Sequence, residues 1–194
     1  MDKRTFRFLE KLKMKESVEA PNNYVEDPYS AEDMVQEVSE RSGALSPEDV
    51  RKIHFIESSE GKMLQNPGSS AKGNFQIIDS TRKEIKKELA NKGVTEIPVN
   101  PLRKDALLTG ELMNKYKNKL ENAGIEPNLE NMYLMHNRGV SGALNAIKNP
   151  KSDKNKQVWS KVRALLKRNP PAREPDMVAE QVPSNDLLEL LREE

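Results

Sequence analysis

The chain of 194 residues contains no cysteine and only two histidines. Without cysteine it can form no disulfide, no thiolate nucleophile and no Cys-ligated zinc or iron–sulfur site. Two histidines without an HExxH pattern also argue against a His-rich metal site. We therefore expect neither a metal ion nor a cofactor.

Long apolar runs are missing as well. The longest one is far shorter than the roughly 20 residues of a membrane-spanning helix. Residues 1–15 are charged at nearly every other position and contain no apolar stretch typical of an export signal. We expect no membrane span and no Sec signal peptide.

Positive and negative charges are nearly balanced but unevenly distributed. The 32 Lys and Arg residues and 31 Asp and Glu residues leave a net charge of +1. Residues 1–40 carry a net −4, residues 41–168 a net +10 and residues 169–194 a net −5. This division predicts an acidic N-terminal attachment segment, one basic domain, and a Pro-rich acidic linker that ends in a short amphipathic helix.

Composition and helix-cap signals predict a mainly α fold. Charged residues make up 32% of the chain. Ser46-Pro47-Glu48-Asp49 is a strong helix start, with a cap, a proline in the first turn and acids at the positive end of the helix dipole. Similar signals predict helices at 2–16, 31–42, 46–58, 80–91, 100–122 and 153–168, one that begins at 128, and a short one after 141.

The expected helix at 184–192 carries four leucines, which are too many to bury within two turns. We interpret this helix as a docking peptide for a partner protein or for another copy of the chain. Packing of the helix back on its own domain is the alternative.

Glu57 lies where a catalytic acid could act. Val50, Ile53 and Glu57 share one face of the expected helix, so Glu57 ends an apolar stripe just before the polar loop 61–73. Partial burial favours the protonated form of a carboxyl group, and such an acid can protonate a glycosidic oxygen at neutral pH. A helix-terminal glutamate that simply reaches water is the alternative.

Three motifs follow one another around this residue. They are Glu57-Ser58, the block GNFQIIDST from Gly73 to Thr81, and Met135-His136-Asn137-Arg138-Gly139. In their order and spacing, residues 44–149 resemble the soluble lytic transglycosylases, a family with a lysozyme-like fold that cleaves the glycan strands of peptidoglycan. The stretch 69–76 is similar to versions found in bacteriophage particle proteins.

The resemblance implies a role for each matching residue. Glu57 matches the family's single catalytic acid and base, and Ser58 matches the serine that helps to orient the reacting sugar. Gly73 matches a position where the backbone passes close to the cleft. Gln76 and Asn137 match polar residues that line the cleft near the N-acetyl groups, and Gly139 matches the turn after the third motif. Phe75, also counted among the substrate-binding residues, replaces the usual Met, which is a change between apolar residues.

Two positions depart from the family pattern. Asp79 stands where the family usually has Pro, as it often does in phage-type members. His136 replaces the usual Tyr and is counted here among the substrate-binding residues, because it could hydrogen-bond near the reacting sugar and also titrate. The alternative for His136 is a neutral side chain that donates a hydrogen bond to a carbonyl.

By resemblance, the reaction needs only one carboxyl group. Glu57 would protonate the oxygen between N-acetylmuramic acid (MurNAc) and N-acetylglucosamine (GlcNAc), and later deprotonate the 6-hydroxyl of MurNAc, which gives a 1,6-anhydro product. Ordinary glycosidases use two carboxylates. Hydrolysis of the muramidase type, with Glu60, Asp79 or Glu84 activating water, is therefore an alternative.

The expected partners follow from charge and resemblance. The +10 segment suits an anionic wall polymer. Without an export signal, we expect a phage particle to carry the chain as a tail or internal protein that opens the host wall during genome entry. Residues 1–40 and 169–194 would bind other virion proteins or another copy of the chain.

One alternative is a structural virion protein with this fold and vestigial activity. A second alternative is a nucleic-acid-binding module, and the low aromatic content of 5% argues against it.

Overall fold

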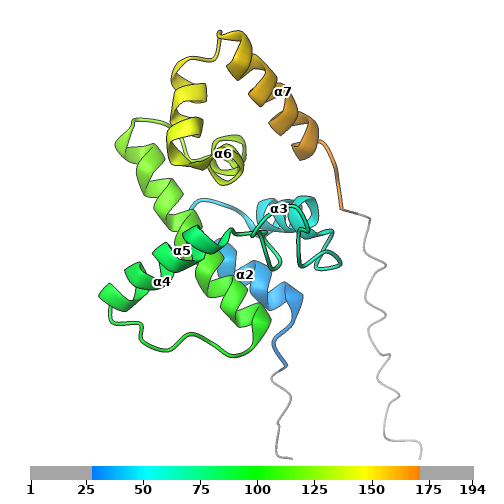
Figure 1. The fold of residues 1–194 in the computed structure, drawn as a ribbon, viewed down its shortest axis with the longest axis vertical. Coiled ribbons are helices and arrows are strands. Elements are labelled where there is room, and N and C mark those ends of the chain that lie inside the picture. The colour runs from blue at the N-terminus through cyan, green and yellow to red at the C-terminus, as the bar shows by residue number, and fades with distance from the viewer. Residues whose placement is uncertain (1–27, 171–194) are drawn as a thin grey trace, which may run out of the picture.

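The computed structural model describes residues 28–170, and in that part of the chain it confirms a mainly α fold (Figure 1). Its six helices are α2 (Ala31–Ser42), α3 (Pro47–Ser58), α4 (Asp79–Asn91), α5 (Pro101–Asn122), α6 (Leu129–Lys148) and α7 (Asp153–Leu166). Among these residues, β-type pairing is limited to two isolated bridges, Gln65 with Lys72 and Lys72 with Ile77. The helices expected at 2–16 and 184–192 lie outside the described residues.

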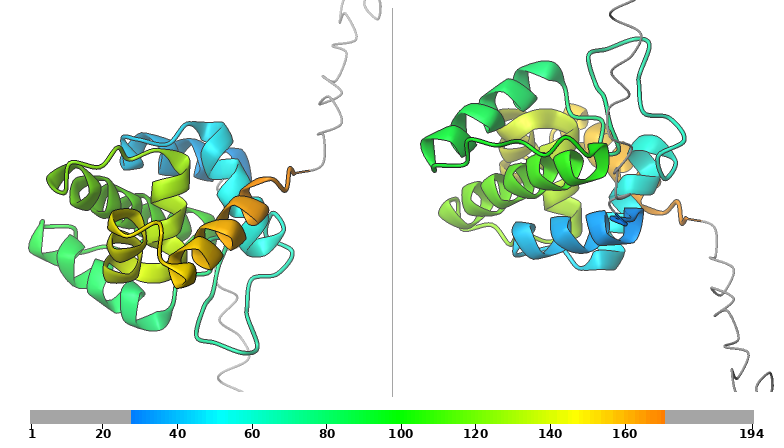
Figure 2. Two further views of the ribbon diagram at one scale, coloured as in Figure 1. Left: turned by 90° about the horizontal axis from the view of Figure 1, so that it is seen from above. Right: turned by 90° about the horizontal axis from the view of Figure 1, so that it is seen from below.

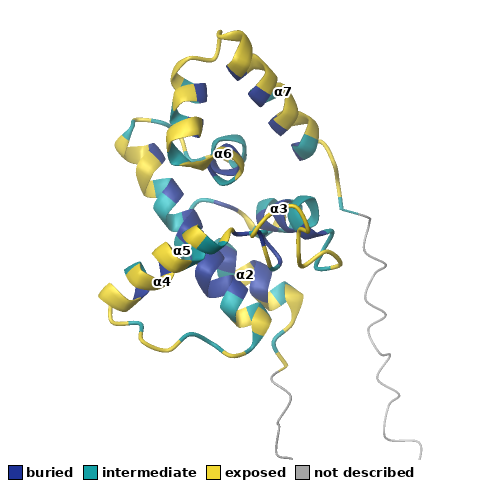
Figure 3. Ribbon diagram, in the orientation of Figure 1, coloured by how far each residue is buried: buried dark blue, intermediate teal, exposed yellow. Residues whose placement is uncertain are grey.

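Helices α2 and α5 form the most extensive helix–helix contact of the fold. The Ser30 hydroxyl caps α2 by accepting a hydrogen bond from the Asp33 amide at 3.1 Å. Met34, Val35 and Val38 of α2 are buried and belong to the hydrophobic core, and α2 carries dark blue in Figure 3. The expected domain boundary at residue 40 is therefore wrong, because it cuts through a helix whose apolar stripe belongs to the common core.

Helix α6 combines two of the expected helices. Its first half begins after the Asn128 cap and its second half ends at Lys148, with a break at Gly139, where φ is 69° and ψ is 166°. The first half carries the third motif and is strongly buried through Tyr133, Leu134 and Met135.

Helix α7 closes the fold against α6 and α3. Val158, Val162 and Leu166 are buried and Leu165 is partly buried, so the helix expected at 153–168 packs on the core through one apolar stripe. The segment between α3 and α4, residues 59–78, projects from the helical body in both views of Figure 2. No described helix has the length and apolar character needed to span a membrane.

Candidate functional site

Glu57 lies in the last turn of α3, which ends in a tight left-handed turn. Residues 59–61 all have positive φ, at 53°, 58° and 85°. Ser58 is completely buried, and its hydroxyl donates to His54 O at 3.1 Å and accepts from Gly61 N at 3.0 Å. Ser58 therefore stabilises the end of the helix, and its hydroxyl does not face solvent.

The Glu57 carboxyl group faces two side chains of α6. Tyr133 Oη donates to Glu57 Oε1 at 2.9 Å, and His136 Nε2 lies 3.9 Å from the same oxygen. Tyr133 and His136 are three residues apart and so share a helix face. The Glu57 side chain is 16% exposed, so the carboxyl group is mostly enclosed but still in contact with solvent.

Tyr133 is a permanent hydrogen-bond donor to this carboxyl group. Burial raises the pKa of its hydroxyl well above the ordinary value, and the charge of Glu57 and the hydrogen bond with it raise the pKa further. A hydrogen bond with the Asn137 side chain acts in the opposite direction but does not reverse the shift. The phenol therefore keeps its proton throughout the physiological pH range.

His136 is oriented by the backbone of the second motif. Its Nε2 lies 2.9 Å from Phe75 O. Because a carbonyl oxygen only accepts, this hydrogen bond requires a proton on Nε2. Among the described residues, His136 Nδ1 is buried without a hydrogen-bond partner. This is the geometry of an imidazole that donates to a carbonyl, the simpler of the two roles expected for His136.

A buried ion pair holds the second motif in place. Asn74 donates to Asp105 Oδ2 from its backbone N at 2.7 Å and from its side chain at 2.9 Å. Arg82 Nη2 lies 3.4 Å from Asp105 Oδ1. Asn74 Oδ1 in turn lies 2.9 Å from His54 Nε2, and burial lowers the pKa of His54, an effect that this hydrogen bond partly offsets. The motif is thereby tied to α3, α4 and α5.

Two residues of the second motif, Gly73 and Phe75, have surroundings that the sequence did not indicate. Gly73 has φ of 77°, and a Cβ there would lie 2.5 Å from Asp105 Oδ2 and 2.6 Å from Arg82 Nη2. Glycine is therefore required by the ion pair. The Phe75 ring is 1% exposed and packs on the His54 ring with centroids 5.4 Å apart, so Phe75 contributes its carbonyl to the site while its ring belongs to the core.

The remaining predicted residues meet at an open pocket, which we call the polar pocket. It has a volume of about 320 Å³. Its lining combines an apolar side, formed by Ile77, Ile78, Leu112 and Tyr116, with a side formed by Gln76, Thr81, His136, Asn137, Arg138 and Gly139, after which it is named. The Gln76 side-chain amide donates to the carbonyls of Met63 and Gly73 at 3.0 and 2.9 Å. Glu57 does not itself line the polar pocket, but its carboxyl oxygen is 3.9 Å from His136, which does.

The three acids considered for activating water have different surroundings. Asp79 Oδ1 lies 3.5 Å from Lys72 Nζ, and Glu84 Oε1 lies 2.6 Å from Lys115 Nζ. Glu60 lies in the left-handed turn directly after α3. Between residues 28 and 170, no group of three or more His, Asp or Glu side chains is arranged to hold a metal ion.

Sequence reasoning missed three residues that organise the site. Tyr133 lies outside all three motifs, but its spacing of three from His136 indicates that both share one helix face. Asp105 precedes the apolar run Ala106-Leu107-Leu108, and a carboxylate in such a context needs a partner. Asn74, within the second motif, supplies that partner.

Comparison of the chain with protein-family models, with curated proteins and with solved structures found no match.

Proposed function

We propose that this chain is a peptidoglycan lytic transglycosylase with a lysozyme-like domain. It cleaves the β-1,4 bond between MurNAc and GlcNAc and leaves a 1,6-anhydro-MurNAc end. The observation that supports this most is the arrangement of Glu57, a mostly enclosed carboxyl group with a phenol donor at 2.9 Å, next to a polar pocket lined by residues of the second and third motifs. The resemblance of the three motifs supplies the substrate class.

In the proposed reaction, protonated Glu57 donates its proton to the glycosidic oxygen as the bond to C1 of MurNAc breaks. The carboxylate that forms accepts the hydrogen bond of Tyr133. It then removes the proton of the MurNAc 6-hydroxyl, whose oxygen attacks C1. Because this nucleophile belongs to the same sugar, it acts at a high effective concentration, and no second carboxylate is needed.

The polar pocket is the proposed site for an N-acetyl sugar. Gln76, Asn137 and Gly139 line it and are accessible from it, so they are the proposed substrate contacts. His136 lines the same pocket and connects it to Glu57. Ser58, Gly73 and the Phe75 ring support this arrangement from within the protein.

The substitution Glu57→Gln tests the enzymatic proposal. Loss of a general acid costs about 100-fold or more in rate, so this variant should release almost no muropeptides from purified walls. Glu60→Gln is the matched control, since it removes a neighbouring carboxylate from the turn directly after α3 and should keep the activity of the proposed transglycosylase. Equal activity of the Glu57→Gln variant and the wild type would refute the proposal.

Mass spectrometry of the released muropeptides separates the reaction types. Anhydro ends support the transglycosylase, whereas reducing ends together with an inactive Glu60→Gln variant indicate a muramidase. If the wild-type protein releases no muropeptide, the chain is better interpreted as a structural virion protein.

We also propose that the chain is carried by a phage particle and acts at the host wall during genome entry, bound to other virion proteins through its acidic ends. Removal of residues 171–194 should leave wall cleavage by the purified protein unchanged and reduce its incorporation into particles. Because these residues follow α7, the described helices stay complete in the truncated chain. Loss of cleavage in this variant would contradict a role of the segment in attachment alone.

A further inference from the structure

A second pocket adjoins the polar pocket along α6 and α7. It has a volume of about 240 Å³ and is lined by Asn137, Arg138, Lys154, Gln157, Val158 and Lys161. Asn137 and Arg138 line both pockets. A branched ligand whose one arm occupies the polar pocket can therefore place another arm in this second pocket, which we call the basic pocket.

The basic pocket is lined by three cations and by no acid. Within residues 28–170, Arg138, Lys154 and Lys161 make no ion pair or hydrogen bond with another side chain, whereas Lys156 lies 3.2 Å from Asp153 and Arg163 lies 3.2 Å from Glu130. Three uncompensated positive charges around one small pocket give a local positive potential that attracts an anion.

We propose that the basic pocket binds a carboxylate of the peptide that peptidoglycan carries on its muramic acid residues. This inference rests on the proposed function. In a peptide-bearing strand the lactyl carboxyl group of muramic acid is an amide, so the carboxylates of the attached peptide are the anionic groups next to a bound sugar. The guanidinium of Arg138 can bind a carboxylate through two parallel hydrogen bonds, and the two lysines add point charges.

Helix spacing supports a built site on one side of α7. Lys154, Gln157, Val158 and Lys161 recur at intervals of three and four residues, so they share one face of the helix. On that face Val158 is buried, and the polar side chains border the pocket around it. The pocket therefore belongs to the packed junction of α6 and α7.

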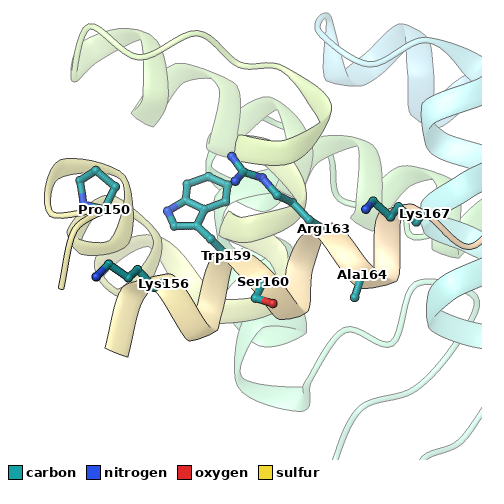
Figure 4. A pocket seen from close by; sticks show the side chains of 7 residues that line it. All are labelled: Pro150, Lys156, Trp159, Ser160, Arg163, Ala164 and Lys167. Atoms are coloured by element: carbon teal, nitrogen blue, oxygen red, sulfur yellow. The ribbon is translucent and has the colours of Figure 1, made fainter. Parts of the chain in front are cut away.

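The other side of α7 provides a matched control (Figure 4). Lys156 and Lys167 line a separate surface hollow there together with Trp159. The double substitution Lys156→Gln/Lys167→Gln also removes two positive charges, from α7 and its C-cap, but both lie outside the basic pocket.

The test compares wall strands that carry peptides with strands from which an amidase has removed them and whose freed lactyl carboxyl groups have been converted to neutral amides. An exposed ion pair contributes a factor of about two to five. The Lys154→Gln/Lys161→Gln variant should therefore lower kcat/KM for peptide-bearing strands, relative to peptide-free strands, by roughly threefold to twentyfold. The control variant should leave this ratio unchanged. An equal loss of kcat/KM for peptide-bearing and peptide-free strands would overturn the proposal, because the basic pocket would then bind sugar.

Binding measured with the Glu57→Gln protein separates this proposal from the proposed function. Its affinity for a soluble GlcNAc-MurNAc-tetrapeptide should exceed that for the peptide-free disaccharide with its lactyl carboxyl group amidated, and Lys154→Gln/Lys161→Gln should remove the difference. If wild type cleaves walls but the substitutions leave the preference intact, only the peptide site is refuted. If no muropeptide is bound or cleaved, the proposed function fails. The wild type is also tested for oligonucleotide binding. If it binds, and Lys154→Gln/Lys161→Gln abolishes this binding while wall cleavage is unchanged, the pocket is assigned to nucleic acid and the proposal is overturned.

Discussion

Replacing Tyr133 with Phe should slow the reaction without weakening substrate binding. The substitution removes one hydroxyl and keeps the ring, which is 1% exposed and therefore remains packed in the core. The lost group is the donor that lies 2.9 Å from Glu57 Oε1. Because the hydroxyl is buried, it cannot touch a sugar in the polar pocket directly.

The magnitude follows from the charge that Glu57 acquires during the reaction. As its proton moves to the glycosidic oxygen, the carboxyl group becomes a carboxylate, and a hydrogen bond to a charged group contributes about 1.5–3 kcal/mol. The Glu57 side chain is 16% exposed, so water can replace part of this bond. A remaining loss of about 1–2 kcal/mol corresponds to a fall in kcat of roughly fivefold to thirtyfold.

The assay is muropeptide release from purified walls, with kcat and KM determined separately. Tyr29→Phe is the matched control, because Tyr29 donates to Glu37 Oε2 at 2.5 Å within the α2 region, so the same atom is removed from a Tyr–Glu pair away from the site. The control should retain kcat and lose only some stability. The reasoning fails if Tyr133→Phe keeps wild-type kcat, or if its effect falls on KM alone.

Two further predictions concern stability. Burial lowers the pKa of His54 in the folded protein. Below about pH 6.5, His54 is therefore protonated more readily in the unfolded chain than in the folded protein. The free energy of unfolding should therefore fall from pH 7 to pH 5, with a contribution of up to about 1.4 kcal/mol per pH unit from His54. Urea denaturation at several pH values should show a shallower fall in the His54→Gln variant than in the wild type. Equal slopes of unfolding free energy against pH would contradict this cause. Gly139 has φ of 69° and ψ of 166°, a conformation that costs a residue with a Cβ about 1–3 kcal/mol. Gly139→Ala should thus lower Tm, whereas Gly142→Ala, at a helical position where the new Cβ meets only Arg138 Cβ at 3.4 Å, should raise it slightly; equal Tm values would refute the conformational argument.

Helix positions could be predicted from the sequence because their signals are local. Ser46 accepts from Asp49 N at 3.1 Å, and the Asp49 carboxylate accepts from Ser46 N at 3.1 Å, which is the capping box that the residue types indicate. The error at α2 was not local. Its charged residues suggested an appendage, while the burial of Met34 and Val38 depends on α5, about 70 residues further along the chain.

The candidate site was predictable only in part for the same reason. Its motifs mark Glu57, Gln76 and His136, but the sequence does not say which side chains face the substrate and which face the protein. Ser58 hydrogen-bonds to its own helix, and Gly73 makes room for an ion pair. The Ser58 contacts are local, whereas the ion pair beside Gly73 joins Arg82 and Asp105 from elements that lie further along the chain.

The three motifs are joined through contacts that form a closed path. His54 of α3 bonds Asn74, the next residue Phe75 accepts from His136 of α6, and His136 approaches Glu57 on α3 again. Asp105 stabilises this path by accepting hydrogen bonds from the backbone amide and the side-chain amide of Asn74. The position of the Glu57 carboxyl group relative to the polar pocket therefore depends on all three motifs at once. An isolated Glu-Ser pair at a helix end carries little functional information, whereas the same pair within this path holds its carboxyl group at one place relative to the polar pocket, as the proposed proton transfer requires.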